Sequence, residues 1–203
     1  MKNKYKLLIF DLDGVLLNSK NNMRLSWNYV RKKNKINSLF NDYFSFIGLP
    51  FEEILKKLNV NSNHEKIKKM YSKTSLKNIK KVKPFPGVIK NLKNLKKIYK
   101  LAIVTSKDAL RTKYFIKKLK INFDYVSCPA EGLRGKPYPD QINLVLKKLK
   151  ISNKYTLYVG DTIIDYKCAK LAKVKFIYAK YGFQKINFKK NIINSFSELN
   201  KFL

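Results

Sequence analysis

Short apolar runs and longer amphipathic segments alternate along most of this chain. After a first apolar run at 7–10, further runs of strand length occur at 101–105, 123–127, 155–160 and 174–179. Apolar residues at helical spacing predict helices at 88–99, 108–119, 139–149, 163–172 and 195–203. Regular alternation of strands and helices predicts a parallel sheet that is covered by helices on both faces.

Residues 16–83 interrupt this alternation, because they show helical spacing alone. Helices are predicted at 21–35, 40–47, 51–58 and 64–79, with a Gly-Leu-Pro turn at 48–50. We therefore expect an α/β protein whose three-layer, Rossmann-like core consists of residues 1–15 and 84–203. Residues 16–83 would form a small all-helical domain inserted after the first strand, with hinges at 16–20 and 82–86.

The composition is strongly basic, with a formal net charge of +32 over 203 residues. Such a charge is typical of proteins that bind nucleic acids or anionic membranes. Almost all the basic residues are lysines spread along the whole chain, and Asn, Ile, Tyr and Phe are abundant too. Nucleic-acid binders usually concentrate their charge in tails or in one patch. A compositional bias therefore explains the lysines better than a nucleic-acid partner, although the positive field should favour the capture of phosphorylated anions.

Cysteine usage and hydropathy indicate the cellular context. Cys128 and Cys168 match neither a disulfide framework nor a metal-binding spacing. No apolar run approaches the length of a membrane span. The basic segment 1–6 is followed by only four apolar residues, too few for the core of a secretory signal. We therefore expect a cytoplasmic protein without a membrane partner. Whether it is a monomer or a homodimer stays open.

Two acidic residues follow the first apolar run directly. Asp11 and Asp13 are separated by one residue, so in an extended chain their carboxylates point to the same side. Two carboxylates at the end of a buried strand repel each other, which favours a cation between them or a proton on one of them. Gly14 allows a sharp turn and a close approach of the backbone to a ligand.

Polar residues close two of the later apolar runs as well. Thr105 and Ser106 follow one run, and Asp161 follows another, with Asp165 four residues further on. Parallel sheets bind ligands at the carboxyl ends of their strands. We therefore expect these side chains to lie close to Asp11.

The segments that carry these residues match a known set of motifs. Four of them occur in order along the chain: Asp-Leu-Asp-Gly-Val-Leu at 11–16, Thr-Ser at 105–106, Lys-Pro-Tyr-Pro at 136–139 and Gly-Asp-Thr-Ile-Ile-Asp at 160–165. Together they resemble the motifs of the haloacid dehalogenase (HAD) superfamily, in its phosphoglycolate phosphatase-like branch. The resemblance implies the HAD fold and makes 16–83 a helical C1 cap, a lid over the active site. Asn18 stands where the family usually carries Asp, at a position without a catalytic role.

The resemblance also implies catalytic roles for three residues. Asp11 would be the nucleophile that forms an aspartyl-phosphate. Asp13 would act as general acid and then as general base. Lys136 would neutralise both the nucleophile and the transferring phosphoryl group.

The same resemblance implies the residues that bind phosphate and metal. Phosphate would be bound by Thr105, Ser106, Gly14 and Lys136. The implied cofactor is Mg²⁺, which prefers oxygen ligands. Its ligands would be Asp11, Asp13, through its backbone carbonyl, and Asp161. Asp165 would lie behind them and orient Lys136 or a water molecule on the metal.

The substrate is expected to be a small phosphorylated metabolite, such as phosphoglycolate or a sugar phosphate. Related proteins place a substrate-contacting loop where Gly48 and Leu49 lie, and Arg24 is a candidate donor to a substrate anion. The expected function is therefore that of a Mg²⁺-dependent phosphatase. One alternative is a phosphomutase that acts on a sugar phosphate with the same residues. Another is a basic, nucleic-acid-associated protein, either an end phosphatase or a binder.

Overall fold

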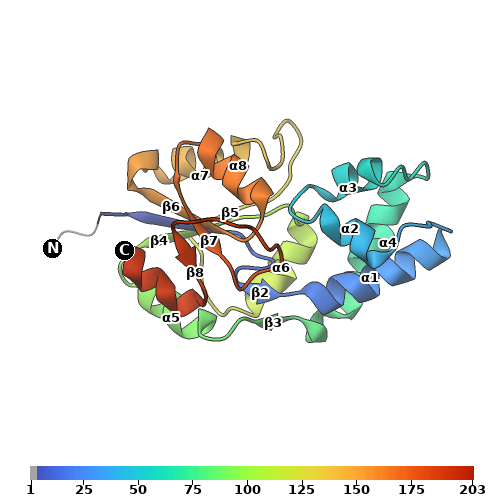
Figure 1. The fold of residues 1–203 in the computed structure, drawn as a ribbon, viewed down its shortest axis with the longest axis horizontal. Helices are drawn as coiled ribbons and strands as arrows, with labels where there is room; N and C mark the ends of the chain where they lie inside the picture. The colour runs from blue at the N-terminus through green and yellow to red at the C-terminus, as the bar shows by residue number, and fades with distance from the viewer. Residues whose placement is uncertain (1–3) are drawn as a thin grey trace.

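The computed structural model describes residues 4–203, and its centre is a parallel six-stranded sheet (Figure 1). The strands lie in the order β5-β4-β1-β6-β7-β8. Their bounds are β1 Leu7–Phe10, β4 Lys100–Val104, β5 Tyr125–Ser127, β6 Thr156–Gly160, β7 Lys175–Ala179 and β8 Ile192–Ile193. The predicted strands are all present, and β8 is a further strand of two residues that is too short to give a sequence pattern.

Strand β1 lies in the middle of the sheet because both of its faces are apolar. Leu8 and Phe10 belong to the hydrophobic cluster on one side, and Leu7 and Ile9 to the cluster on the other. All four side chains are fully buried, as expected of a strand in a parallel sheet covered on both faces.

Helices cover both faces of the sheet, which confirms the expected three-layer α/β fold. Helix α5 (Val88–Lys96), helix α6 (Ala109–Lys117) and the 3-10 helix η3 (Phe196–Phe202) pack on one face. Helices α7 (Asp140–Leu149) and α8 (Ile163–Leu171) pack on the other. Within residues 4–203, no helix is both long and apolar enough to cross a membrane.

Four further helices form a separate layer at the end of the sheet that lies away from the N-terminus (Figure 1). They are α1 (Lys20–Lys33), α2 (Phe40–Ser45), α3 (Phe51–Lys57) and α4 (His64–Lys77), and the 3-10 helix η1 (Ile79–Lys81) follows them. This helical insert, residues 20–81, has a hydrophobic cluster of its own around Trp27, Tyr43 and Tyr71. The rings of Trp27 and Tyr43 are stacked with their centroids 4.7 Å apart.

The chain enters and leaves the helical insert through two short strands that pair with each other. In this second sheet β2 (Leu17–Asn18) is antiparallel to β3 (Lys83–Pro84), with Leu17 opposite Pro84. The sequence pattern predicts hinges at 16–20 and 82–86 and gives no sign of this pairing. Two-residue strands, one of them ending in proline, are too short to show the alternation of a strand.

Candidate active site

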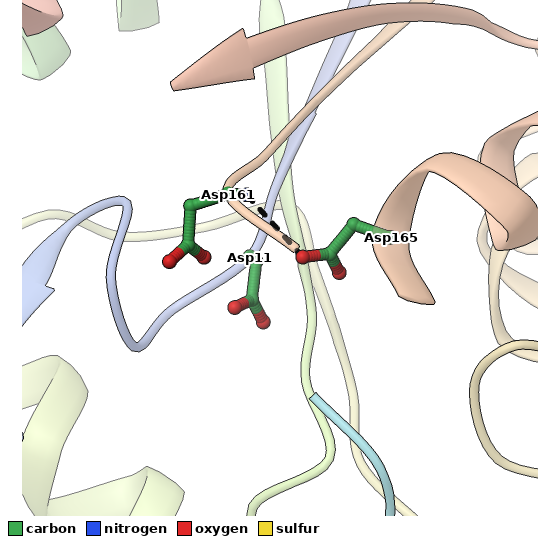
Figure 2. Close-up of side chains that lie close together, drawn as sticks. All are labelled: Asp11, Asp161 and Asp165. Atoms are coloured by element: carbon green, nitrogen blue, oxygen red, sulfur yellow. Dashed lines mark hydrogen bonds between the residues drawn. The ribbon is translucent and has the colours of Figure 1, made fainter. Parts of the chain in front are cut away.

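Three buried aspartates lie together where two neighbouring strands end (Figure 2). Asp11 directly follows β1, Asp161 directly follows β6, and Asp165 lies in the first turn of α8. Since β1 and β6 are paired in register, their ends bring Asp11 and Asp161 side by side. One carboxylate oxygen from each aspartate lies within 4.8 Å of those of the other two.

Lys136 supplies the positive charge among these acids, and it is only 1% exposed. Its Nζ lies 2.8 Å from Asp11 Oδ1 and 2.7 Å from Asp165 Oδ1, and it donates to the hydroxyl of Tyr158 at 3.0 Å. Burial alone would lower the pKa of Lys136, but the carboxylates of Asp11 and Asp165 raise it above its ordinary value. The lysine therefore carries its charge at neutral pH.

Both oxygens of Asp165 are engaged within the protein. Oδ1 accepts from Lys136 and from the Tyr158 hydroxyl at 2.7 Å, and Oδ2 accepts from the Thr162 hydroxyl at 2.6 Å and its backbone N–H at 3.1 Å. Burial opposes ionisation, but the ion pair with Lys136 outweighs it and lowers the pKa of Asp165. Asp165 thus joins the first turn of α8 to Lys136. Tyr158 carries no motif signal, and sequence reasoning does not identify it.

Asp161 has an oxygen without a partner. Its Oδ2 accepts from the backbone N–H of Phe183 at 2.7 Å, whereas its buried Oδ1 has no hydrogen-bond partner within residues 4–203. Burial, followed by repulsion from Asp165 and Asp11, raises the pKa of Asp161 well above its ordinary value. Gly14 lies against this carboxylate, and a Cβ at that position would be 2.1 Å from Asp161 Oδ2.

Asp11, like Asp161, lies in an environment that raises its pKa. Burial raises the pKa of Asp11 to about 7, an effect that Lys136 opposes and that Asp165 and Asp13 reinforce. Buried carboxylates that repel each other, with one unpartnered oxygen among them, are the donor set that a hard divalent cation requires. The residues present therefore fit a Mg²⁺ ion.

The side chain of Asp13 is not part of this acidic group. Its Oδ1 accepts from the hydroxyl of Ser19 at 2.5 Å, and its Oδ2 lies 2.9 Å from Lys107 Nζ. Lys107 is 5% exposed, and its ammonium also lies 4.1 Å from the centroid of the Phe115 ring. Sequence reasoning misses Lys107, since nothing distinguishes it from the other lysines of the chain.

The Thr105–Ser106 turn lies beside these acids and contacts the helical insert. Thr105 Oγ1 accepts from the backbone N–H of Lys107 at 3.2 Å, and its carbonyl accepts from the Gln141 side chain at 3.0 Å. The hydroxyl of Ser106 donates to the carbonyl of Gly48 at 2.6 Å. The insert is thus hydrogen-bonded to the loop that follows β4.

A cavity of about 50 Å³ lies between the sheet and the helical insert. Its walls bring together most of the expected site residues: Asp11, Asp13, Thr105, Ser106 and Lys136 from the core, with Gly48 and Leu49 from the insert. Arg24 does not line it, because its side chain is exposed and bonds Asn21 at 3.0 Å. The cavity walls also include polar residues that the sequence does not single out: Tyr43, Tyr71, Lys107, Arg111 and Thr162.

Curated relatives with similar sequences extend over nearly the whole chain. A phosphoglycolate phosphatase from Aquifex aeolicus is 28% identical over 187 residues, which are 90% of this chain and 88% of that protein. A glyceraldehyde 3-phosphate phosphatase from Methanocaldococcus jannaschii is 26% identical, with 96% and 95% covered. Pyrophosphatase PpaX from Oceanobacillus iheyensis is 23% identical, with 92% and 88% covered.

Solved structures share the fold at lower identity. The haloacid dehalogenase-like family protein SP0104 from Streptococcus pneumoniae superposes with a TM-score of 0.85 at 22% identity, covering 98% of each chain. CbbY from Rhodobacter sphaeroides, solved in complex with phosphate, gives a TM-score of 0.83 at 16% identity and covers 96% of each chain. These likenesses show that the sheet and the helical insert form a known architecture.

The family model of haloacid dehalogenase-like hydrolases matches residues 8–179. This range contains β1 from Leu8 onward, the helical insert and all of the aspartates described above. The chain therefore belongs to the haloacid dehalogenase-like hydrolases, within their phosphoglycolate phosphatase-like branch.

Proposed function

We propose that this phosphoric monoester hydrolase is a Mg²⁺-dependent phosphatase that cleaves a small phosphorylated metabolite through an aspartyl-phosphate on Asp11. The observation that carries the proposal is the cavity wall shared by Asp11, Asp13, Thr105 and Lys136. A nucleophile, an acid, a hydroxyl donor and a buried cation around one small space meet the needs of phosphoryl transfer.

In the first step, Asp11 attacks phosphorus while Lys136 holds its other oxygen. The bond between phosphorus and the leaving oxygen breaks, and Asp13 donates a proton to that oxygen. Thr105 and the backbone N–H groups of Leu12 and Ser106 donate to the phosphoryl oxygens, whereas the N–H of Gly14 donates to the carbonyl of Leu17 at 2.9 Å. Lys136 offsets the negative charge that would otherwise repel the nucleophile from phosphorus.

In the second step, Asp13 takes a proton from a water molecule that attacks phosphorus. The bond between phosphorus and Asp11 breaks, which releases inorganic phosphate and restores the carboxylate. Ser19 and Lys107 hold the carboxylate of Asp13 at the cavity wall during both steps. The closed insert limits the access of other water molecules.

We assign the metal to Asp11, Asp161 and the backbone carbonyl of Asp13. The unpartnered Oδ1 of Asp161 supports this assignment. When bound, Mg²⁺ would neutralise the carboxylates and the phosphoryl oxygens together. Asp165, whose oxygens are already engaged, would keep Lys136 in position.

The test is phosphate release from a panel of phosphorylated metabolites, with and without Mg²⁺. We expect the native chain to require Mg²⁺ and Asp11→Asn to lose at least about 10³-fold in kcat at an unchanged melting temperature. Glu65→Gln, which alters an exposed acid of the insert, serves as the control and should keep full activity. Comparable turnover in Asp11→Asn would contradict the proposal. Isomerisation of a hexose phosphate without net phosphate release would contradict it as well.

A further inference from the structure

Arg111 is a buried cation of the cavity wall to which the mechanism above gives no role. It lies in the first turn of α6 and is 6% exposed. Its Nε lies 2.5 Å from Asp108 Oδ2. Within residues 4–203 its only ion pair is the one with Asp108, and a side-chain hydrogen bond links it to Tyr71.

Two tyrosines of the helical insert lie next to this guanidinium. Its central carbon is 4.9 Å from the centroid of the Tyr71 ring, and the hydroxyl of Tyr71 lies 3.0 Å from that of Tyr43. Burial raises the pKa of both tyrosines, so both are neutral. Since two hydroxyls share a single hydrogen bond, one O–H of the pair remains free to donate.

The other two cations of the cavity are already engaged. Lys136 pairs with Asp11 and Asp165, and Lys107 pairs with Asp13. Arg111 pairs with Asp108 only through Nε. Its terminal nitrogens and the free tyrosine O–H therefore make this part of the wall rich in donors.

The size and shape of this region indicate what it binds. The cavity is small, with a volume of about 50 Å³, which favours a compact substrate. Two terminal guanidinium nitrogens match the two oxygens of a planar carboxylate. A second phosphoryl group is bulkier and fits this volume less well.

On the basis of the proposed phosphatase function, we propose that Arg111 and the Tyr43–Tyr71 pair form a second anion subsite. This subsite binds the carboxylate of a small phosphorylated acid while its phosphoryl group lies at Asp11. Arg111 would thus decide between phosphorylated acids and phosphorylated alcohols.

The test compares two phosphate esters of similar size, 2-phosphoglycolate and 2-hydroxyethyl phosphate, which differ in the carboxylate. For the native chain we expect kcat/KM to favour 2-phosphoglycolate by roughly ten- to a hundredfold, as for a hydrogen-bonded charged group. Arg111→Met should bring this ratio close to one, mainly by raising KM for 2-phosphoglycolate. Arg111→Lys keeps the positive charge but lacks the two terminal nitrogens that can bond both oxygens of a carboxylate. It should therefore give an intermediate ratio.

Arg134→Met is the matched control. Arg134 also bonds an aspartate, Asp140, and lies 4.6 Å from the centroid of a tyrosine ring, but it is exposed and outside the cavity. This variant should keep the native ratio. Both substrates are measured on the same preparation, so partial unfolding of Arg111→Met would lower both rates equally. Unfolding alone therefore cannot produce the expected change in the ratio.

Three results would overturn the subsite. They are a native ratio near one, an equal loss on both esters in Arg111→Met, and a preference for pyrophosphate over 2-phosphoglycolate that depends on Arg111. Each of these leaves the phosphatase proposal intact as long as some phosphate ester is hydrolysed with Mg²⁺. Failure to hydrolyse any ester would contradict the proposed function itself.

Discussion

Ser106 donates its hydroxyl to the carbonyl of Gly48 over 2.6 Å, and this hydrogen bond joins the catalytic sheet to the helical insert. The same loop of the insert makes two more close contacts. A Cβ at Gly48 would be 2.8 Å from Thr162 Oγ1, and a Cβ at Gly135 would be 2.4 Å from Pro50 Cγ. The insert is therefore seated on the site, and its position depends on the small size of these glycines.

Gly48→Ala should disturb this seating. The added methyl group would meet Thr162, and the positive φ of +101° is unfavourable for alanine. We expect kcat/KM to fall by between about ten- and a hundredfold, because the cavity residues of the two parts move apart. Gly132→Ala is the control, since Gly132 also has a positive φ of +70° but open space around it. Equal losses in the two variants would show that backbone strain alone is responsible.

Lys136→Met should affect stability as well as activity. It removes the cation from between Asp11 and Asp165, and leaving buried carboxylates unpaired costs about 3 kcal/mol in the free energy of unfolding. Urea denaturation at pH 7 measures this cost. Lys56→Met makes the matched comparison, because Lys56 pairs with Glu52 and Glu53 on the surface, where the solvent screens the charges and a much smaller cost is expected. A Lys136→Met protein as stable as the native chain would contradict this reading of the ion pairs.

Asp161→Asn and Asp165→Asn should differ in the absence of metal. Asp161 has an unpartnered oxygen and a raised pKa. In EDTA, the melting temperature of Asp161→Asn should therefore equal or exceed that of the native chain. Asp165 is paired with Lys136 and has a lowered pKa, so Asp165→Asn should melt lower. Mg²⁺ at a hundred times its Kd should stabilise the native chain by about 2.7 kcal/mol and leave Asp161→Asn unaffected. A normal response of Asp161→Asn to Mg²⁺ would exclude it as a ligand.

Asp124 provides a pH-dependent test of the fold that is independent of the metal. Burial opposes ionisation, but the bonds from Lys96, Lys100 and the Leu101 N–H lower the pKa of Asp124. A lowered folded-state pKa stabilises the fold above the unfolded value of 3.8, and the stabilisation disappears as the pH falls through the folded value. Asp124→Asn should therefore cost about 1 kcal/mol at pH 7.

This cost should shrink below pH 4 or so, as the native carboxylate gains its proton. Urea denaturation of both chains across this pH range measures it. A difference between the two chains that stays constant into the acid range would mean that the charge of Asp124 contributes nothing.

The central part of the site is predictable because local pattern and topology agree there. The apolar run 7–10 has the pattern of a strand buried on both faces, and the parallel arrangement then brings Asp11, Thr105 and Asp161 to one edge. The helices of the insert are predictable too, since their apolar spacing is regular. The pairing of β2 with β3 is not, because strands of two residues leave no periodic signal.

The cavity wall is harder to predict than the strand ends. Arg24 and Arg111 both lie on helices, but Arg24 is exposed beside the buried Met23, whereas Arg111 is buried under the insert. Which arginine faces the cavity depends on how α4 packs against α6, a contact between segments far apart in the sequence. Lys107 cannot be distinguished in the sequence from the other lysines and arginines, which number 45 in all. Its place in the cavity wall likewise depends on contacts between distant segments.

The pairing of β2 with β3 has a consequence for how such a protein can be altered. Asn18 lies opposite Lys83, so the insert begins and ends at neighbouring points of the core. A tight reverse turn could bridge these points without moving β1 or α5. The helical insert could therefore be replaced by inserts of other lengths at the same two points, while the catalytic sheet keeps its structure.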